Sequence, residues 1–323
     1  MKNEVKTLAD AIRYFSDEQT CIDTVAFMRW PTGPECPACL ALKDRQHWLK
    51  NQRRWQCREC GRQYSVKLNT IFEDSAISLK KWLPAMWLLA NCKNGVSSYE
   101  IARSIGITQK SAWFMLHRIR EAMKSGSIRK FGSRGGPVEV DEAFIGPDTT
   151  RMHRKDRLRR IELNKHQGKV VVMGMLDRDL RQVRAQVIPD VKRTTVQAAI
   201  LNQIGHGSTI YTDNSVSYDF LKKTDFVHET VNHMTEYVRG QVHTNGIENF
   251  WSLLKRGLRG TYVAVEPFHL SRYTDEQVFR YNNRATKDNP MTDADRFALA
   301  VSQISGKRLT YAELTGKVPE TPF

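Results

Sequence analysis

The chain has 323 residues, which leaves room for about two domains and one small additional module. Hydrophobic residues make up 40% of it and charged residues 26%, a composition that excludes intrinsic disorder, collagen-like repeats and a disulfide-stapled miniprotein. No stretch approaches the roughly 18 consecutive apolar residues of a membrane span, and the N-terminus lacks the apolar core of a signal peptide. We therefore expect a protein without membrane contact that works in the cytoplasm, associated with the nucleoid if it is prokaryotic.

The net charge of +15 is distributed unevenly along the chain. Residues 1–136 carry 23 basic and 12 acidic side chains, whereas residues 137–323 carry 27 and 23. Such an excess of Lys and Arg favours binding to a polyanion, most simply nucleic acid, because each contact with a phosphate releases condensed counterions. The alternative is a generally basic surface that only keeps the protein in solution.

Four of the six cysteines form two Cys-x-x-Cys pairs, Cys36 with Cys39 and Cys57 with Cys60. The 17 residues between the pairs match the spacing of two-knuckle zinc sites. A disulfide framework is the alternative, and the reducing cytoplasm argues against it. We therefore predict one structural Zn²⁺ held by all four thiolates, while the two remaining cysteines lack partners at ligand spacing.

A helical periodicity that begins at Leu79 stops at Asn94 and Gly95. The next stretch, VSSYEIARSIGITQKSAWFMLHRIREAM, predicts two helices joined by a turn at Gly106, with Thr108 capping the second. This pattern is typical of a helix-turn-helix. Many helical hairpins bind nothing, but the local basic charge favours DNA contact. The side chains that the second helix is expected to present to DNA are those of Gln109, Lys110, Ser111 and Arg118.

After a linker rich in Gly and Ser, the pattern becomes typical of strands. Three strands, a helix, a strand and further helices follow one another, an order that predicts an RNase H-like mixed sheet with flanking helices, an α/β architecture. A further strand is expected near 226–230. The other expected strands span residues 138–145, 169–176, 181–189 and 207–213, and the helix spans residues 191–204.

Three acidic residues stand far apart in this region, near the ends of expected elements. Asp141 lies in the first strand, Asp213 ends the fourth, and Glu248 lies in HTNGIENFWSLLKRGL. Carboxylates that converge at a sheet edge can hold two divalent ions about 4 Å apart for phosphodiester chemistry, and Mg²⁺ prefers such oxygen ligands. Glu142 should face the opposite side of the strand from Asp141. Asp213 could instead cap the helix that follows it.

The motifs VEVDEAFIG, YTDNS, HTNGIENFWSLLKRGLRGTY and HLSRYTDEQVFRYNNR, in this order, resemble the catalytic domain of DDE insertion-sequence transposases that carry an N-terminal zinc ribbon. The resemblance extends over about residues 20–290. It implies an RNase H-like fold and a catalytic triad of Asp141, Asp213 and Glu248 that binds two Mg²⁺ ions, for which Mn²⁺ can substitute. It also implies metal-dependent cleavage at transposon ends and strand transfer into target DNA, and joining two ends calls for a homodimer or a larger assembly.

The roles of several neighbouring residues stay open. Asn245 is an alternative for the third triad position, because some members of the family carry Asn there. His243 could orient a carboxylate or a phosphate, or simply precede a helix. Lys255 and Arg256 follow Glu248 by about two helical turns, and the family pattern implies contact with DNA phosphates. As isolated cations they would instead be solvated.

Two further charged features lie outside the predicted triad. Glu276 and Arg280 are four residues apart on an expected helix, which predicts an exposed ion pair. The segment 148–168 is rich in Arg and Lys and is long for a connection between two paired strands. We hypothesise that it is a flexible arm that becomes ordered on DNA.

The predicted function is that of an insertion-sequence DNA transposase that binds terminal inverted repeats in double-stranded DNA. The acidic residues favour it over a zinc-ribbon and helix-turn-helix regulator with an inactive RNase H-like domain. The N-terminal modules favour it over a stand-alone RNase H-like nuclease. The predicted segments are an N-terminal helical segment (1–30), a zinc ribbon (31–72), a helix-turn-helix region (76–125), a linker (126–136), an RNase H-like catalytic domain (137–290) and a C-terminal helical appendage (291–323).

Overall fold

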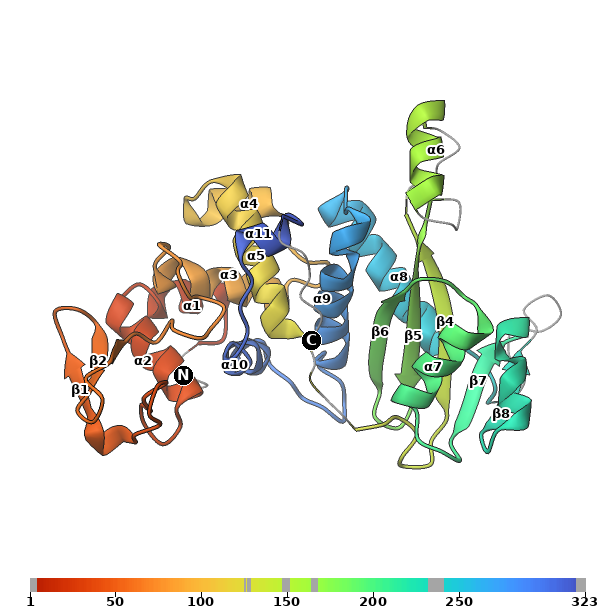
Figure 1. The fold of residues 1–323 in the computed structure, drawn as a ribbon, viewed down its shortest axis with the longest axis horizontal. Coiled ribbons are helices and arrows are strands. Elements are labelled where there is room, and N and C mark those ends of the chain that lie inside the picture. Colours follow the sequence, from red (N-terminus) through yellow and green to blue (C-terminus); the bar gives the residue numbers. More distant parts are fainter. Residues whose placement is uncertain are drawn as a thin grey trace. The chain divides into compact units, whose positions relative to one another are not determined.

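The computed structural model describes residues 5–124, 126, 129–146, 152–163, 168–231 and 241–317. The chain forms two compact units, one built from residues 1–124 and 283–323 and the other from residues 125–282. Figure 1 shows the elements of each unit.

A small antiparallel sheet in the first unit carries the cysteine pairs. Its strand order is β1-β2-β3, and Trp55 of the central strand packs on Trp48 and Tyr64, with ring centroids 4.5 Å and 6.1 Å away. These rings supply most of the apolar contact in a module too small for an ordinary core. The elements here are α1 (Leu8–Tyr14), α2 (Glu18–Arg29), η1 (Lys43–Arg45), β1 (Gln46–Leu49), β2 (Arg54–Cys57) and β3 (Gln63–Tyr64).

Helix α3 (Leu79–Asn91) lies in the core of the first unit, and its apolar residues at three- and four-residue steps are buried as predicted. Helix α10 (Asp293–Ser302), from the far end of the chain, packs on it through Phe297. The ring of Phe297 lies 5.3 Å from that of Trp87 and 5.5 Å from that of Phe15. The segment after residue 290, which has no role in the sequence analysis, therefore completes this core.

The two helices predicted after α3 are present as α4 (Ser98–Ile105) and α5 (Gln109–Met123), and a short helix α11 (Tyr311–Leu314) follows α10. Ser97 caps α4 in a capping box with Glu100, and Thr108 caps α5 by accepting a hydrogen bond from the backbone of Ser111. Gly106 has a φ of +62°, a left-handed conformation that glycine adopts without strain. The sharp turn between the helices is therefore a local consequence of the sequence.

The second unit contains a five-stranded mixed sheet with the order β6-β5-β4-β7-β8. The three strands on the β6 side pair antiparallel, and β7 and β8 run parallel to β4. This is the strand arrangement of the RNase H-like fold, and the predicted α/β class is confirmed. The strands are β4 (Val138–Ile145), β5 (Val170–Asp177), β6 (Gln182–Ile188), β7 (Thr209–Asp213) and β8 (Val227–Val231).

Alternate residues of β4 face two different cores. Val138 and Val140 pack against α7 (Arg193–Gln203) and the 3-10 helix η3 (Val216–Lys223). Ala143 faces the opposite core, formed with α8 (Asn245–Gly257) and α9 (Leu270–Asn282). Figure 1 shows α7 and α8 on opposite sides of the sheet. Because β5 is covered on both faces, its sequence is almost continuously apolar.

Helix α8 runs directly into a π-helical turn, η4 (Leu258–Tyr262), and η5 (Pro267–His269) precedes α9. Val263, just after the π-helical turn, has a φ of +61°, which a β-branched residue rarely adopts. At the other end of α9, the side chain of Asn282 donates a 2.8 Å hydrogen bond to the carbonyl of Val183 and accepts a 2.7 Å bond from its N–H. Helix α9 is thereby tied to the edge strand β6.

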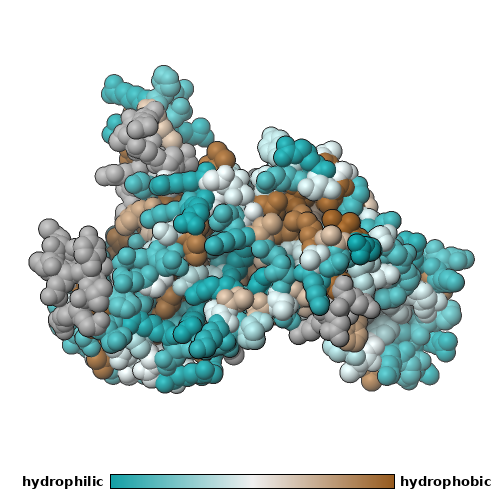
Figure 2. All heavy atoms as spheres, turned by 180° about the vertical axis from the view of Figure 1, so that it is seen from behind, coloured by the Kyte–Doolittle hydropathy of each residue, from teal (hydrophilic) through white to brown (hydrophobic). Residues whose placement is uncertain are grey.

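Part of the basic segment 148–168 is helical. Residues 154–163 form α6 (Arg154–Leu163), and the side chains from His153 to Arg159 are exposed, including that of Leu158 at 56%. Figure 2 shows the hydrophilic surface of this projecting element. Residues 148–151 and 164–167 lie outside the described residues, so the hypothesis that this arm becomes ordered on DNA stays a prediction.

The stretch expected to be a linker, residues 126–136, differs from that expectation at its C-terminal end. Phe131 is 1% exposed and belongs to the core on the α7 side of the sheet. Its N–H donates a 2.8 Å hydrogen bond to the carbonyl of Gln203, and the N–H of Gly132 donates a 2.8 Å bond to Asp177. An apolar ring and two satisfied backbone donors hold this end of the stretch on the second unit.

Candidate functional site

The four predicted zinc ligands converge at the turns of the small sheet. The sulfur atoms of Cys36, Cys39, Cys57 and Cys60 all lie within 4.8 Å of one another, and two of the pairs are 3.6 Å apart. Four thiolates at 2.3 Å from a tetrahedral Zn²⁺ would be about 3.8 Å apart, so the cluster fits this ion. The backbone N–H groups of Cys60 and Glu59 help to lower the pKa of Cys57 to about 6, which favours the thiolate.

A cluster of this compactness occurs once among the described residues: no other group of three or more His, Cys, Asp or Glu side chains there has its ligand atoms within 4.8 Å. All four corners of the tetrahedron are occupied by protein ligands. The cluster therefore has the closed form of a structural zinc site, with no corner left for a substrate or water.

Asp141 lies on the face of β4 that is covered by α8. The indole N–H of Trp251, on α8, donates a 2.9 Å hydrogen bond to its carboxylate. Gly174 is the residue opposite Asp141 on β5, and a Cβ there would lie 2.6 Å from the Trp251 ring. The missing side chain at position 174 therefore makes room for the ring that orients Asp141.

The pKa of Asp141 depends on the two other predicted triad residues. It is raised to about 6, mainly by burial; the negative charges of Asp213 and Glu248 contribute to this rise, and the hydrogen bonds of Asp141 oppose it. The three carboxylates therefore interact electrostatically, although they are less compact than the cysteine cluster.

Strand pairing explains the position of Asp213. Strands β4 and β7 run parallel, with Val138 opposite Ile210 and Glu139 opposite Tyr211. Continuing this register brings Asp213 level with Asp141, on a neighbouring strand about 4.8 Å away. The parallel pairing of β7 with β4 brings the two residues to neighbouring strands, although 71 residues lie between them in sequence.

Glu248 reaches the same place from a helix. It lies in the first turn of α8, and its carboxylate accepts a 2.8 Å hydrogen bond from the hydroxyl of Thr244. Asn245, the alternative third residue, is the first residue of α8 and is exposed. Both residues are described by the structure, and of the two, Glu248 contributes to the raised pKa of Asp141.

Glu142 is a second acidic residue of β4 whose role the sequence analysis missed. It faces the side of the sheet opposite Asp141, as predicted, and its carboxylate accepts a 2.6 Å hydrogen bond from Tyr218 of η3. The pKa of Glu142 is raised to about 7, mainly by burial; the charges of Asp141 and Asp213 contribute to the rise, and the hydrogen bond from Tyr218 opposes it. The sequence signal was present in the paired acids of VEVDE, but Tyr218 is 76 residues away and no motif links the two.

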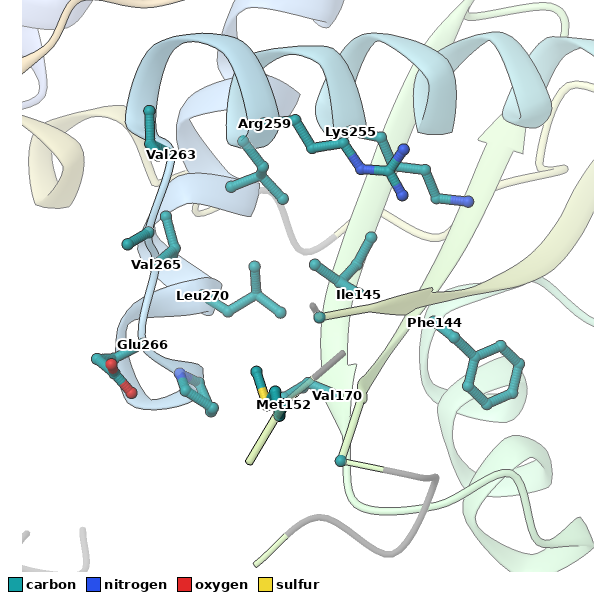
Figure 3. Close-up of a pocket in the computed structure, with 15 residues that line it drawn as sticks. Phe144, Ile145, Met152, Val170, Lys255, Arg259, Val263, Val265, Glu266 and Leu270 are labelled. Carbon is teal, nitrogen blue, oxygen red and sulfur yellow. The ribbon is translucent and has the colours of Figure 1, made fainter. Parts of the chain in front are cut away.

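A cavity of about 550 Å³ lies beside the end of β4. Figure 3 shows two cationic side chains, Lys255 and Arg259, along one wall and aliphatic side chains such as Ile145 and Leu270 around the rest. Lys255 is half-buried, whereas Arg256, the other predicted phosphate contact, is exposed outside the cavity lining. Arg259 lies one helical turn after Lys255 and was not identified from the sequence.

Two family profiles match the chain. The ISXO2-like transposase domain matches residues 134–282, and the transposase zinc-ribbon domain matches residues 16–63. A transposase-like protein of Haemophilus influenzae is 33% identical over 106 residues, which cover 33% of this chain and 85% of that protein. The chain belongs to the ISXO2-like transposase family.

Other similar proteins cover more of this transposase. A protein in transposable element ISH50 of Halobacterium salinarum is 26% identical over 256 residues, 76% of this chain and 85% of that protein. The catalytic core domain of BIV integrase covers 50% of this chain and 92% of its own, with a TM-score of 0.33 and 13% identity. The simian T-cell lymphotropic virus intasome, in complex with PP2A regulatory subunit B56 gamma, gives a TM-score of 0.28 and 13% identity over 58% of this chain and 66% of that chain. The fold assignment of this transposase rests on its strand order.

The predicted DNA-reading residues of α5 in this transposase fall into two groups. Lys110 is exposed, with its ammonium 4.9 Å from the ring centroid of Tyr311, and Gln109 donates a 2.9 Å hydrogen bond to Ser98. Ser111 lies beside them in the first turn. The prediction that Arg118 points outward is wrong.

Arg118 is 4% exposed, because position 118 lies on the face of α5 that packs inward. Its guanidinium donates a hydrogen bond to the carbonyl of Glu73 and lies 5.6 Å from the ring centroid of Trp82. A lysine or arginine on a predicted DNA-reading helix can therefore serve the core of the protein instead.

The prediction of an exposed ion pair between Glu276 and Arg280 is also wrong. The two side chains form an ion pair, but Glu276 is fully buried and Arg280 is 8% exposed. Tyr262, from the π-helical turn after α8, donates a further hydrogen bond to Glu276. The pair is buried because α9 packs on the sheet edge and on α8, which helical periodicity in one segment does not reveal.

His243 lies in the segment that precedes α8, where its ring and carbonyl contact Arg178. In the part of the chain that the structure describes, no helix is both long and apolar enough to span a membrane.

Proposed function

We propose that this transposase cleaves DNA strands at the ends of an insertion sequence and joins them to target DNA. The observation that carries the proposal is the meeting of the elements that bear Asp141, Asp213 and Glu248: β7 pairs parallel with β4, and Trp251 of α8 donates a hydrogen bond to Asp141. Carboxylates near one another at a sheet edge repel each other, the more so where burial removes water, as at Asp141, and a divalent cation relieves that repulsion. The donor set is all carboxylate, which suits Mg²⁺, with Mn²⁺ as a substitute.

Each residue has a separate part in the proposed reaction. Asp141 and Asp213 supply neighbouring oxygen ligands from two parallel strands, Glu248 supplies a third from α8, and the indole of Trp251 holds Asp141 in orientation. Two bound Mg²⁺ ions would activate the attacking oxygen and stabilise the leaving oxygen of the phosphodiester. The half-burial of Asp141 limits competing water around the reacting groups.

We propose that Lys255 and Arg256 bind DNA phosphates beside this site, and that Arg259 joins them. Lys255 and Arg259 line one cavity, so a phosphate there would meet two cations. This pairing supports the predicted contact at Lys255 more directly than sequence spacing does.

We propose that the zinc ribbon and the first turn of α5 recognise the terminal inverted repeats. The residues of that turn are Gln109, Lys110 and Ser111. The N-terminal turn of the second helix is the part that reaches base edges in helix-turn-helix proteins. Arg118 is left out, because its guanidinium is committed to Glu73. The proposed assembly on DNA is a homodimer or larger, working in the cytoplasm and associated with the nucleoid if the cell is prokaryotic.

The test is metal-dependent cleavage and joining of a DNA that carries the element's own ends. Replacing Asp213→Asn is expected to reduce both reactions by about 10³-fold, because a neutral amide is a poor ligand and removes a charge at the reacting centre. Asp219→Asn is the matched control, since Asp219 is an exposed acid of η3 that pairs with Lys222.

Four results would separate the candidate functions. Loss of activity in Asp213→Asn alone, with folding and end binding retained, supports the transposase proposal. Equal activity of the wild type and Asp213→Asn would reject the triad. End binding without cleavage in any form of the protein would favour the regulator, and cleavage without preference for the element's ends would favour the nuclease.

A further inference from the structure

A third carboxylate of β4, that of Glu139, is buried more deeply than either of its acidic neighbours. It is 1% exposed, and its Oε1 atom lies 2.6 Å from the Nε atom of Arg178. Its other oxygen accepts a 2.9 Å hydrogen bond from the backbone N–H of Ile247. The imidazole of His243 is 3.7 Å from the same carboxylate. The proposed metal ligands Asp141, Asp213 and Glu248 take no part in these contacts.

The contact with Ile247 fixes the first turn of α8 to the sheet. The first N–H groups of a helix have no partner within the helix, and a carboxylate satisfies them and complements the helix dipole. The helix also approaches closely, because a Cβ at Gly246 would lie 2.9 Å and 3.0 Å from the two oxygens of Glu139. A larger residue at position 246 would force either the carboxylate of Glu139 or this turn to shift.

Arg178, directly after β5, holds the segment that leads into α8. Its guanidinium donates 2.7 Å hydrogen bonds to the carbonyls of Gln241 and His243 and lies 4.8 Å from the ring centroid of Tyr211. The same guanidinium carries the ion pair with Glu139. Strands β4, β5 and β7 are thus connected to one helix start through a single, partly buried cation.

We propose that Glu139 and Arg178 are positioning residues that set the separation between Asp141 and Glu248. Glu139 is two residues before Asp141 on the same face of β4. It accepts a hydrogen bond from the N–H of Ile247, the residue before Glu248. The carboxylate therefore anchors both proposed metal ligands through one contact. The proposal rests on the proposed function, because it concerns ligands of the same site.

This arrangement predicts an effect on metal binding beyond any effect on folding. Groups that orient metal ligands typically change metal affinity or activity by 10–100-fold when they are replaced. Glu139→Gln keeps the shape and an acceptor oxygen but loses the charge that holds Arg178. Gly246→Ala keeps the charges and disturbs the contact between the carboxylate of Glu139 and the helix turn sterically, so it tests the same geometry independently.

The experiment measures divalent-ion binding and cleavage in the full chain. Ca²⁺ binding is followed by calorimetry, with zinc left in the ribbon, and the Mg²⁺ concentration for half-maximal cleavage of element-end DNA is measured alongside. Both variants are expected to weaken ion binding by about 10-fold or more, while DNA-end binding is retained. Glu276→Gln is the matched control, because Glu276 is an equally buried partner of an arginine on α9.

The outcomes distinguish positioning from general stability. A lower melting temperature in all three variants, with weakened ion binding only in Glu139→Gln and Gly246→Ala, supports the proposal. Unchanged ion binding in those two variants, or an equal loss in Glu276→Gln, overturns it. If Glu139→Gln and Gly246→Ala weaken Ca²⁺ binding but the wild type cleaves no DNA, the positioning role is retained and the proposed function is rejected. If the wild type binds no Ca²⁺, the positioning role is overturned.

Discussion

The zinc ribbon and the proposed carboxylate site both gather side chains that can bind metal ions, but they do so over very different lengths of chain. All four cysteines lie within residues 36–60 and meet through hairpin turns. The carboxylates come from two strands and a helix between residues 141 and 248 and meet only when the sheet is complete. A closed cluster of local origin suits a structural ion, whereas a less compact site built from several elements leaves room for a substrate.

The largest expected effect is on the ribbon. In Cys57→Ser the module should lose its zinc and unfold, because binding of a structural zinc contributes about 10–16 kcal/mol in comparable modules. Zinc content and limited proteolysis are the measurements, with Cys92→Ser as the control. Retention of zinc by Cys57→Ser would contradict the four-thiolate site, and the carboxylate site should keep its fold in either variant.

The next largest effect concerns Glu142 and depends on pH. Between its ordinary pKa of 4.5 and its raised value of about 7, the folded protein binds a proton that the unfolded chain releases. The free energy of unfolding therefore falls as the pH rises through this range. Glu142→Gln cannot ionise, so it should be more stable than the wild type by about 3 kcal/mol at pH 8 and about equal at pH 4, in Mg²⁺-free buffer.

Denaturant titrations at the two pH values measure this difference. The comparison at pH 4 is the internal control, because Glu142 is protonated there in both states. A stability difference that is the same at pH 4 and pH 8 would mean that the raised pKa of Glu142 is not its source. The ribbon should show no comparable change with Glu142→Gln.

A smaller effect is expected from Gly174→Ala. The added methyl group would lie 2.6 Å from the ring of Trp251, so the ring must shift and its hydrogen bond to Asp141 must lengthen. We expect a stability loss of about 1–3 kcal/mol and a decrease in cleavage rate of about 10²-fold. Gly260→Ala is the control, since no heavy atom lies within 4 Å of a Cβ there. Equal rates for the two variants would argue against orientation of Asp141 by Trp251.

The smallest effect is expected from Lys110→Ala in α5. Removing one phosphate contact should weaken binding of end DNA and reduce the slope of log affinity against log salt by about one. Fluorescence anisotropy at several salt concentrations measures the slope, and Lys93→Ala removes an exposed charge elsewhere in the same unit. An equal change of slope in both variants would indicate general charge attraction and not a specific contact.

Local patterns predicted a large part of this protein correctly. The cysteine spacing identified the metal cluster, the turn at Gly106 and the cap at Thr108 marked two helices, and the pattern of apolar residues located all five strands of the large sheet to within about two residues. These features depend on residues only a few positions apart. Their physical causes are turn geometry, capping and the two-residue period of a strand.

The remaining features depend on packing between elements that are distant in sequence. The burial of Arg118 and of Glu276, the hydrogen bond from Trp251 to Asp141 and the buried contacts of Glu139 all join elements far apart in sequence. The same holds for Phe297, which completes the core of the first unit from the other end of the chain. No local pattern encodes these contacts, because burial and ion pairing depend on distances that exist only after the sheet and its covering helices have assembled.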